Sequence, residues 1–178
     1  MPIKTERERK TKGKNMSITG MRQLINIQTS DMQAKEIPDN YSEMKLNDGK
    51  GGHPTSIFYN PSNGAPTVSC DKNDMCTIKG NTDGLMIQAG DNGSSLKIEN
   101  GKNVQFESYG GTNNVTFENC SNTSAFGSGK SVDNFTYVDG KDNTNWNMDK
   151  QKDTVLNEKS GWFGGYSENL STHINDGY

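Results

Sequence analysis

The sequence predicts an all-β protein, a parallel β-solenoid of about five coils with a cap at each end. Three observations support this fold class: short runs in which apolar and polar residues alternate, an internal repeat of 19 or 20 residues, and a hydrophobic fraction of only 29%. A solenoid tolerates so few hydrophobic residues because each coil contributes only a few inward side chains to a narrow core.

The alternating runs predict strands that bury one face. In the segment 103–119, Val104 and Phe106 flank one polar residue, and Val115 and Phe117 repeat the arrangement. Successive side chains of a strand point to opposite sides, so we expect the apolar ones to point inward. The predicted inward residues are Ile78, Ile87, Leu96, Ile98, Val104, Phe106, Val115 and Phe117.

The repeat includes both strands and turns. Large side chains recur every 19 or 20 residues at Ile78, Ile98, Phe117 and Tyr137. Two pairs of turn asparagines also align: Asn100 with Asn119, and Asn103 with Asn122. The gaps between strands also fit the loops of an antiparallel meander or sandwich, but such a fold has no reason to keep one residue type at equivalent turns. We therefore expect parallel stacking, with asparagines that hydrogen-bond along the axis.

Composition divides the chain into three segments. Residues 1–42 contain few apolar residues and no repeat, which predicts a flexible segment in which the spacing between residues 21 and 32 allows a weak amphipathic helix. Residues 43–150 hold the predicted solenoid, and residues 151–178 a polar linker and an aromatic segment. We expect Trp162, Phe163 and Tyr166 to form a C-terminal cap, and the alternative is an exposed recognition patch.

Charge and hydropathy exclude several functional classes. The net charge is −3, and the basic-leaning run at residues 4–14 contains no aromatic residue, so we expect no nucleic-acid partner. No run approaches the roughly 18 apolar residues of a membrane-spanning helix, and none follows the basic start as a secretory signal requires. We therefore expect neither membrane insertion nor classical export.

The segment MSITGMRQLINIQTSDMQ changes composition abruptly at Met16, which is an alternative start of the natural protein. It is polar and rich in Ser, Thr and Gln, and it resembles the uncleaved N-terminal signal of bacterial type III secreted effectors. The resemblance covers about thirty residues and implies a virulence protein that is cytoplasmic before export, binds a secretion chaperone, and is secreted without a classical signal peptide. The alternative is a helix that caps the solenoid.

Residues 57–147 resemble the single-stranded, right-handed parallel β-helix of pectate lyases, on the coil length and on the segments NGKNVQFES and NNVTFEN. In those enzymes carboxylates bind calcium, and an arginine or lysine abstracts the proton next to the substrate carboxyl group. The repeats contain no arginine, so the resemblance implies Lys97 as the base, with Glu99 and Glu118 as calcium ligands. The alternative is that these are ordinary solvated residues, because fold does not carry function.

A binding surface is also predicted on the outer side of the coils. One outward row contains Thr77, Lys97, Thr116 and Thr136. Equivalent residues in stacked strands lie about 4.8 Å apart, which suits an extended ligand such as a glycan or a strand of another protein. If the aromatic residues near the C-terminus are exposed, Trp162, Phe163 and Tyr166 are further candidate binding residues.

The three cysteines do not form a metal motif. Cys70 and Cys76 are predicted at inward positions on consecutive strands, where they either remain buried thiols, which we expect, or form a disulfide in an oxidising compartment. Cys120 lies in a turn, which allows exposure. His53 and His173 lack the spacing of zinc ligands, and we expect no cofactor other than the calcium that the lyase resemblance implies.

These observations favour a non-catalytic binding or interaction module, in a secreted bacterial effector or a surface-associated protein. The alternative is a carbohydrate-active enzyme similar to polysaccharide lyases. A third possibility is a phage tail or fibre component, whose solenoids trimerise.

Overall fold

The computed structural model describes residues 21–23, 36–47, 51–160 and 170–174. The chain divides into two compact units, Met1–Tyr41 and Ser42–Tyr178. In the first unit, β1 (Met21–Gln23) pairs antiparallel with β2 (Glu36–Pro38). A strand therefore occupies part of the segment whose spacing allowed a helix. Most of the predicted secretion and chaperone-binding signal lies outside the described residues.

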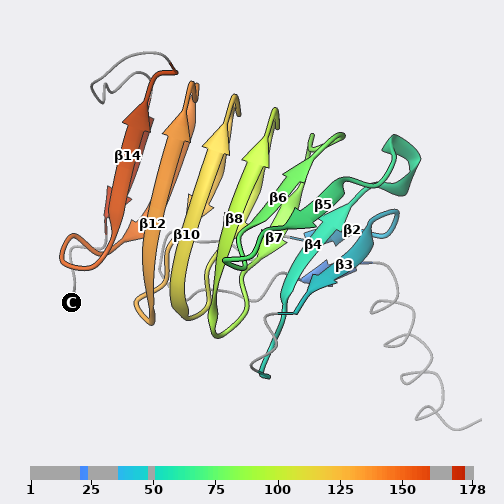
Figure 1. Cartoon of the computed structure of the whole chain (residues 1–178), viewed down its shortest axis with the longest axis horizontal. Coiled ribbons are helices and arrows are strands. Elements are labelled where there is room, and N and C mark those ends of the chain that lie inside the picture. The colour runs from blue at the N-terminus through green and yellow to red at the C-terminus, as the bar shows by residue number, and fades with distance from the viewer. Residues whose placement is uncertain (1–20, 24–35, 48–50, 161–169, 175–178) are drawn as a thin grey trace, which may run out of the picture. The chain divides into compact units, whose positions relative to one another are not determined.

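The second unit is a β-solenoid of about four coils with parallel stacked strands, which confirms the predicted fold class (Figure 1). Its strands form two sheets. The six-stranded sheet contains β5 (Thr67–Cys70), β6 (Cys76–Lys79), β8 (Gly93–Glu99), β10 (Gly111–Glu118), β12 (Ser131–Val138) and β14 (Thr154–Glu158). The seven-stranded sheet contains β3 (Ser42–Leu46), β4 (Thr55–Tyr59), β7 (Met86–Gln88), β9 (Gln105–Glu107), β11 (Ser124–Phe126), β13 (Asn143–Met148) and β15 (Leu170–Ile174).

Four coils contribute one strand to each sheet and have neighbours on both sides, namely β6 with β7, β8 with β9, β10 with β11, and β12 with β13, and β14 and β15 extend the two sheets in parallel at the end. The predicted repeat sets the register, because Ile98 lies opposite Ile78 and Phe117, and Phe117 also lies opposite Tyr137. The coil number is lower than the predicted five because β4 and β5 belong to antiparallel hairpins.

The core is a narrow column of side chains between the two sheets. All eight predicted inward residues are buried, none with more than 2% of its surface exposed, which confirms the predicted alternation. Aromatic rings fill the last coils: Phe117 stacks on Tyr137 with 5.0 Å between ring centroids, and Phe106 meets Phe135 edge to face at 5.5 Å. Each coil thus buries its few large residues against those of its neighbours.

The turns confirm the predicted asparagine ladders. Asn119 donates from Nδ2 to Asn100 Oδ1 at 3.4 Å, and Asn122 makes the equivalent bond to Asn103 at 2.5 Å. All four residues have left-handed backbone, with φ between 52° and 59°. Asparagine tolerates this conformation better than most residues, so backbone shape as well as stacking explains the repeat.

Two antiparallel hairpins form the N-terminal end of the solenoid. β3 pairs with β4, which pairs antiparallel with β7, and β5 pairs antiparallel with β6. At the other end, β14 pairs in parallel with β12 and β15 with β13, so stacking continues beyond residue 150. The three aromatic residues of the expected C-terminal cap, Trp162, Phe163 and Tyr166, lie outside the described residues.

The cysteine predictions were wrong in part. Cys76 is buried, as predicted, but it forms the alternative disulfide with Cys70 instead of remaining a free thiol. Cys70 is exposed, contrary to the predicted inward position, because β5 is the terminal strand of its sheet among the described residues. Cys120 is buried, with 1% of its surface exposed, because it takes the corner position that glycine occupies in the neighbouring coils. Its Sγ accepts the backbone N–H of Gly101 at 3.3 Å.

Candidate functional site

The outer face of the six-stranded sheet carries the predicted row of side chains. Strand pairing places Thr77 and Thr116 on either side of Lys97, and Thr136 beyond Thr116. All four side chains are partly exposed. The row ends at Leu156 of β14, which has 52% of its surface exposed. The predicted row therefore crosses all four coils and reaches the terminal strand.

A second outward row of side chains was not predicted from the sequence. Asn134 donates from Nδ2 to Asn114 Oδ1 at 3.0 Å, and Thr154 donates from Oγ1 to Asn134 Oδ1 at 2.7 Å. The 20-residue spacing of Asn114 and Asn134 was a visible signal in the sequence. The two rows together present hydroxyl and amide groups at regular intervals along the stack.

This face also brings together Lys97, Glu99 and Glu118, the three residues to which the lyase resemblance assigns a base and two calcium ligands. Glu99 and Glu118 lie directly opposite each other on β8 and β10. Lys97 Nζ lies 3.0 Å from Glu99 Oε1 and 2.5 Å from Glu118 Oε2. The ammonium group therefore occupies the position between the carboxylates where a bound cation would lie.

The electrostatics of this cluster oppose a catalytic base. The hydrogen bond to Glu118, followed by the one to Glu99, raises the pKa of Lys97 above its ordinary value. A base that abstracts a carbon-bound proton near neutral pH needs a lowered lysine pKa instead. Among the described residues, no three or more His, Cys, Asp or Glu side chains cluster as a metal site would require.

The outer side of the seven-stranded sheet is a different environment. Glu107 and Phe126 are buried there, although both belong to outward positions of their strands. Tyr109 donates to Glu107 Oε2 at 3.1 Å, and burial, with the nearby carboxylate, raises the pKa of Tyr109. Phe126 stacks on Trp146 with 6.2 Å between ring centroids. Two outward positions on this side are therefore covered, whereas the outward positions of the threonine row are partly exposed.

A buried polar network also lies at one corner of the coils. Asp133 is fully buried and accepts hydrogen bonds from Ser131 at 2.6 Å, Ser108 at 2.9 Å and Asn113 at 2.8 Å. Asp153 accepts the backbone N–H of Asp133 at 2.8 Å, and desolvation raises the pKa of Asp153. Because Asp133 has no exposed surface and its carboxylate is satisfied by these donors, we interpret the network as structural.

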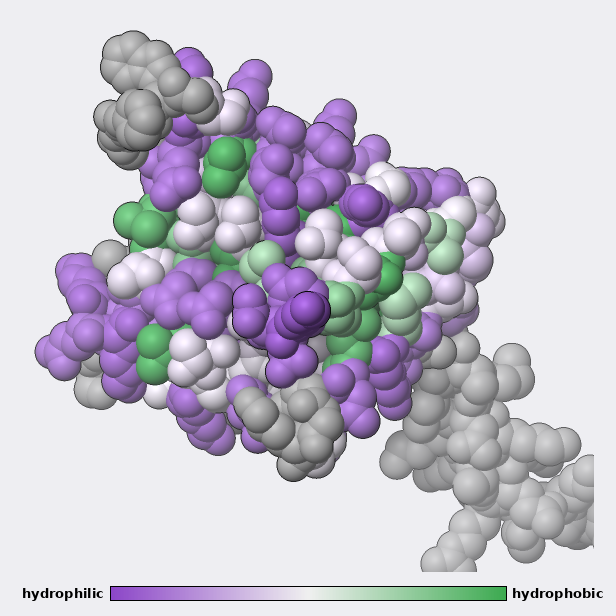
Figure 2. Space-filling model, viewed as in Figure 1, coloured by the Kyte–Doolittle hydropathy of each residue, from purple (hydrophilic) through white to green (hydrophobic). Residues whose placement is uncertain are grey.

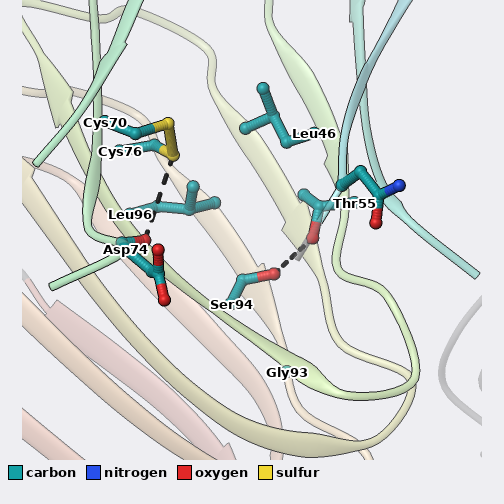
Figure 3. A pocket seen from close by; sticks show the side chains of 9 residues that line it. Leu46, Thr55, Cys70, Asp74, Cys76, Gly93, Ser94 and Leu96 are labelled. Carbon is teal, nitrogen blue, oxygen red and sulfur yellow. Dashed lines mark hydrogen bonds between the residues drawn. A yellow bond between two sulfur atoms is a disulfide. The ribbon is translucent and has the colours of Figure 1, made fainter. Parts of the chain in front are cut away.

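A small pocket of about 140 Å³ opens at the N-terminal end of the solenoid, between the two hairpins (Figure 3). The Cys70–Cys76 disulfide lies on one side and Leu46 of β3 on the other, with Leu96 between them. Thr55 and Ser94 hydrogen-bond to each other at its edge. This pocket was not predicted from the sequence, because it forms only where two antiparallel hairpins take the place of a further coil.

Figure 2 shows the molecule from the side of the six-stranded sheet: hydrophilic and near-neutral residues cover most of the surface, with small separate hydrophobic areas. Within the described ranges, no helix is long and apolar enough to cross a membrane. No protein-family model, no curated protein and no solved structure matches this chain.

Proposed function

We propose that this protein is a non-catalytic binding module and that the outer face of its six-stranded sheet binds an extended glycan. The observation that carries the proposal is the in-register row formed by Thr77, Lys97, Thr116 and Thr136. Neighbouring strands lie about 4.8 Å apart, so a polymer aligned with the stack meets similar chemistry at every coil.

The chemistry of the face favours an uncharged glycan over an acidic one. Threonine hydroxyls and the Asn114–Asn134 amide row both donate and accept hydrogen bonds, as sugar hydroxyls do. The only lysine in the threonine row, Lys97, is already paired with two carboxylates. A polyanion would therefore find no free cation in that row.

The disulfide supports a place of action outside a reducing cytosol. Structural disulfides persist in oxidising compartments, and Cys70 is exposed to any reductant in its surroundings. This favours the proposed secretion without a classical signal peptide, in an effector or a surface-associated protein.

Isothermal titration calorimetry of the full chain tests the proposal. The ligands are soluble xylan, mannan, a β-glucan and polygalacturonate. We expect one of the neutral polymers to bind, and Thr116→Glu to weaken it about tenfold, or about 1.4 kcal/mol, by placing a solvated charge in the row. Ser121→Glu, in a turn beside the sheet, adds the same charge and should leave binding unchanged.

Two results would contradict the proposal. The first is that no neutral polymer binds, and the second is that both variants weaken binding equally. An assay for unsaturated uronate release from polygalacturonate examines the lyase alternative in the same samples. We expect no product, because Lys97 is held in its protonated form.

A further inference from the structure

Among the described residues, both ends of the six-stranded sheet are edge strands: β5 pairs only with β6 in this sheet, and β14 pairs only with β12. Asp71 donates its backbone N–H to the carbonyl of Met75, so these two residues form a hydrogen-bonded pair at the end of the β5–β6 hairpin. In an antiparallel hairpin, hydrogen-bonded and non-hydrogen-bonded pairs alternate from there on. By that alternation, Val68 and Cys70 direct their backbone N–H and C=O groups away from β6. The edge thus offers two donors and two acceptors to an added strand.

At the same end, three described hydrophobic residues that pack against the core, Met44, Leu46 and Val68, remain partly exposed. The pocket of about 140 Å³ lies beside Leu46, next to the disulfide and Leu96 (Figure 3). An inward side chain of one more strand would enter this space, because Cys70 belongs to the inward row that continues through Cys76.

We propose that a second copy of this chain supplies that strand, with β14 of one copy pairing antiparallel to β5 of the next. β14 is parallel to β12, β10, β8 and β6, whereas β5 is antiparallel to β6, so a continued stack places β14 antiparallel to β5. The ends that meet are different, so the contact is head to tail and repeats along a filament.

The inward row sets the register of the contact. Strand pairing aligns one column of residues through the sheet: Cys70, Cys76, Leu96, Val115, Phe135 and Val155. Continuing this column places Val155 of one copy beside Cys70 of the next, with its side chain directed into the pocket. Val155 is an aliphatic residue of suitable size, and it is partly exposed at the open edge.

Charges match in the same register. With Val155 opposite Cys70, Glu158 lies opposite Thr67, whose other neighbour is Lys79. Glu158 and Lys79 are both exposed, so their long side chains can meet across Thr67. At the other end of the contact, Lys152 falls opposite Asn73 and is already paired with Asp149 of its own chain at 3.2 Å. The Glu158–Lys79 attraction is therefore the charge pair that favours this alignment over its neighbours.

Sedimentation velocity of the full oxidised chain, without any glycan, tests the proposal over a wide concentration range. We expect the average mass to rise from that of the 19.6 kDa chain as concentration increases. Lys79→Glu should raise the dissociation constant about tenfold through repulsion with Glu158. Adding Glu158→Lys to that variant should restore association. Lys141→Glu, an equal charge change in an exposed turn, is the matched control.

A backbone variant gives an independent measurement. Val68→Pro removes an N–H that points away from β6, so it should abolish association while circular dichroism remains β-rich. A mass of one chain at every concentration overturns the proposal. So does an oligomer that neither Lys79→Glu nor Val68→Pro weakens, because it would use another surface. Glycan binding is measured separately with the Thr116→Glu variant, so either proposal can fail alone.

Discussion

Single residues decide the shape of the coil corners and the chemistry of the surface. The corner positions need left-handed backbone, and asparagine provides it in two coils while Asp139 and Asp142, each with φ of 52°, provide it in the next. Cys120 replaces a glycine at a buried corner and stays a free thiol. These positions tolerate few residue types, which explains why the repeat is visible in the turns.

Cys120 should not react with thiol reagents in the folded protein. Burial raises the pKa of its thiol to about 11, so almost no thiolate exists at pH 8, and the side chain is enclosed. We expect no modification by a disulfide-exchange reagent at that pH, and one modified thiol per chain in denaturant without reductant. Rapid modification of the native chain would contradict the buried position.

The Lys97 cluster should stabilise the fold in a pH-dependent way. The folded pKa of Lys97 lies above the ordinary lysine value of 10.5, so the contribution of Lys97 to stability is present below pH 10.5 and is lost as the pH rises through the folded pKa. In urea titrations, the free energy of unfolding of Lys97→Met should therefore fall less than that of the unchanged protein when the pH rises from 9 to above the folded pKa of Lys97. The two proteins are compared with each other, so that ionisations common to both cancel. An equal loss in both would mean that the cluster contributes nothing measurable.

At the scale of elements, stability depends on parallel strands that share one narrow core. Phe117 lies in β10 with no exposed surface and contacts rings of the next coil. Each strand of the central coils pairs on both sides. A substitution that disrupts the packing of one coil therefore destabilises the coils that stack on it.

Phe117→Asp should unfold the solenoid. An unpaired buried carboxylate costs several kcal/mol, against a total stability of about 5–15 kcal/mol for an ordinary domain. Circular dichroism and thermal melting check this result. Phe117→Leu, which keeps an apolar side chain, should remain folded with a lower melting temperature. Unchanged melting of the aspartate variant would contradict the buried register.

At the scale of the whole molecule, the solenoid and the segment before it are separate units. The division falls between Tyr41 and Ser42. The solenoid contains its own core and its own two hairpins at the N-terminal end.

A chain that starts at Ser42 should therefore fold. We expect its far-ultraviolet circular dichroism to remain β-rich and its melting temperature to stay close to that of the full chain. Loss of the β signal would show that residues 1–41 are needed to cover the solenoid. The full chain measured under the same conditions is the control.

The sequence by itself determined the coils. Period-two alternation fixes which side chains are buried, and a repeat of 19 or 20 residues fixes which residues lie opposite each other in parallel strands. The same register brought Lys97, Glu99 and Glu118 together, and it placed the threonine row on one face. Only the tertiary structure decided what happens where the repeat stops. The first strands reverse direction as hairpins, which exposes Cys70, forms the disulfide and leaves a pocket beside Leu96. The physical reason is that a terminal strand lacks one neighbour, so its partner and its burial depend on the path of the whole chain and not on its own residue pattern.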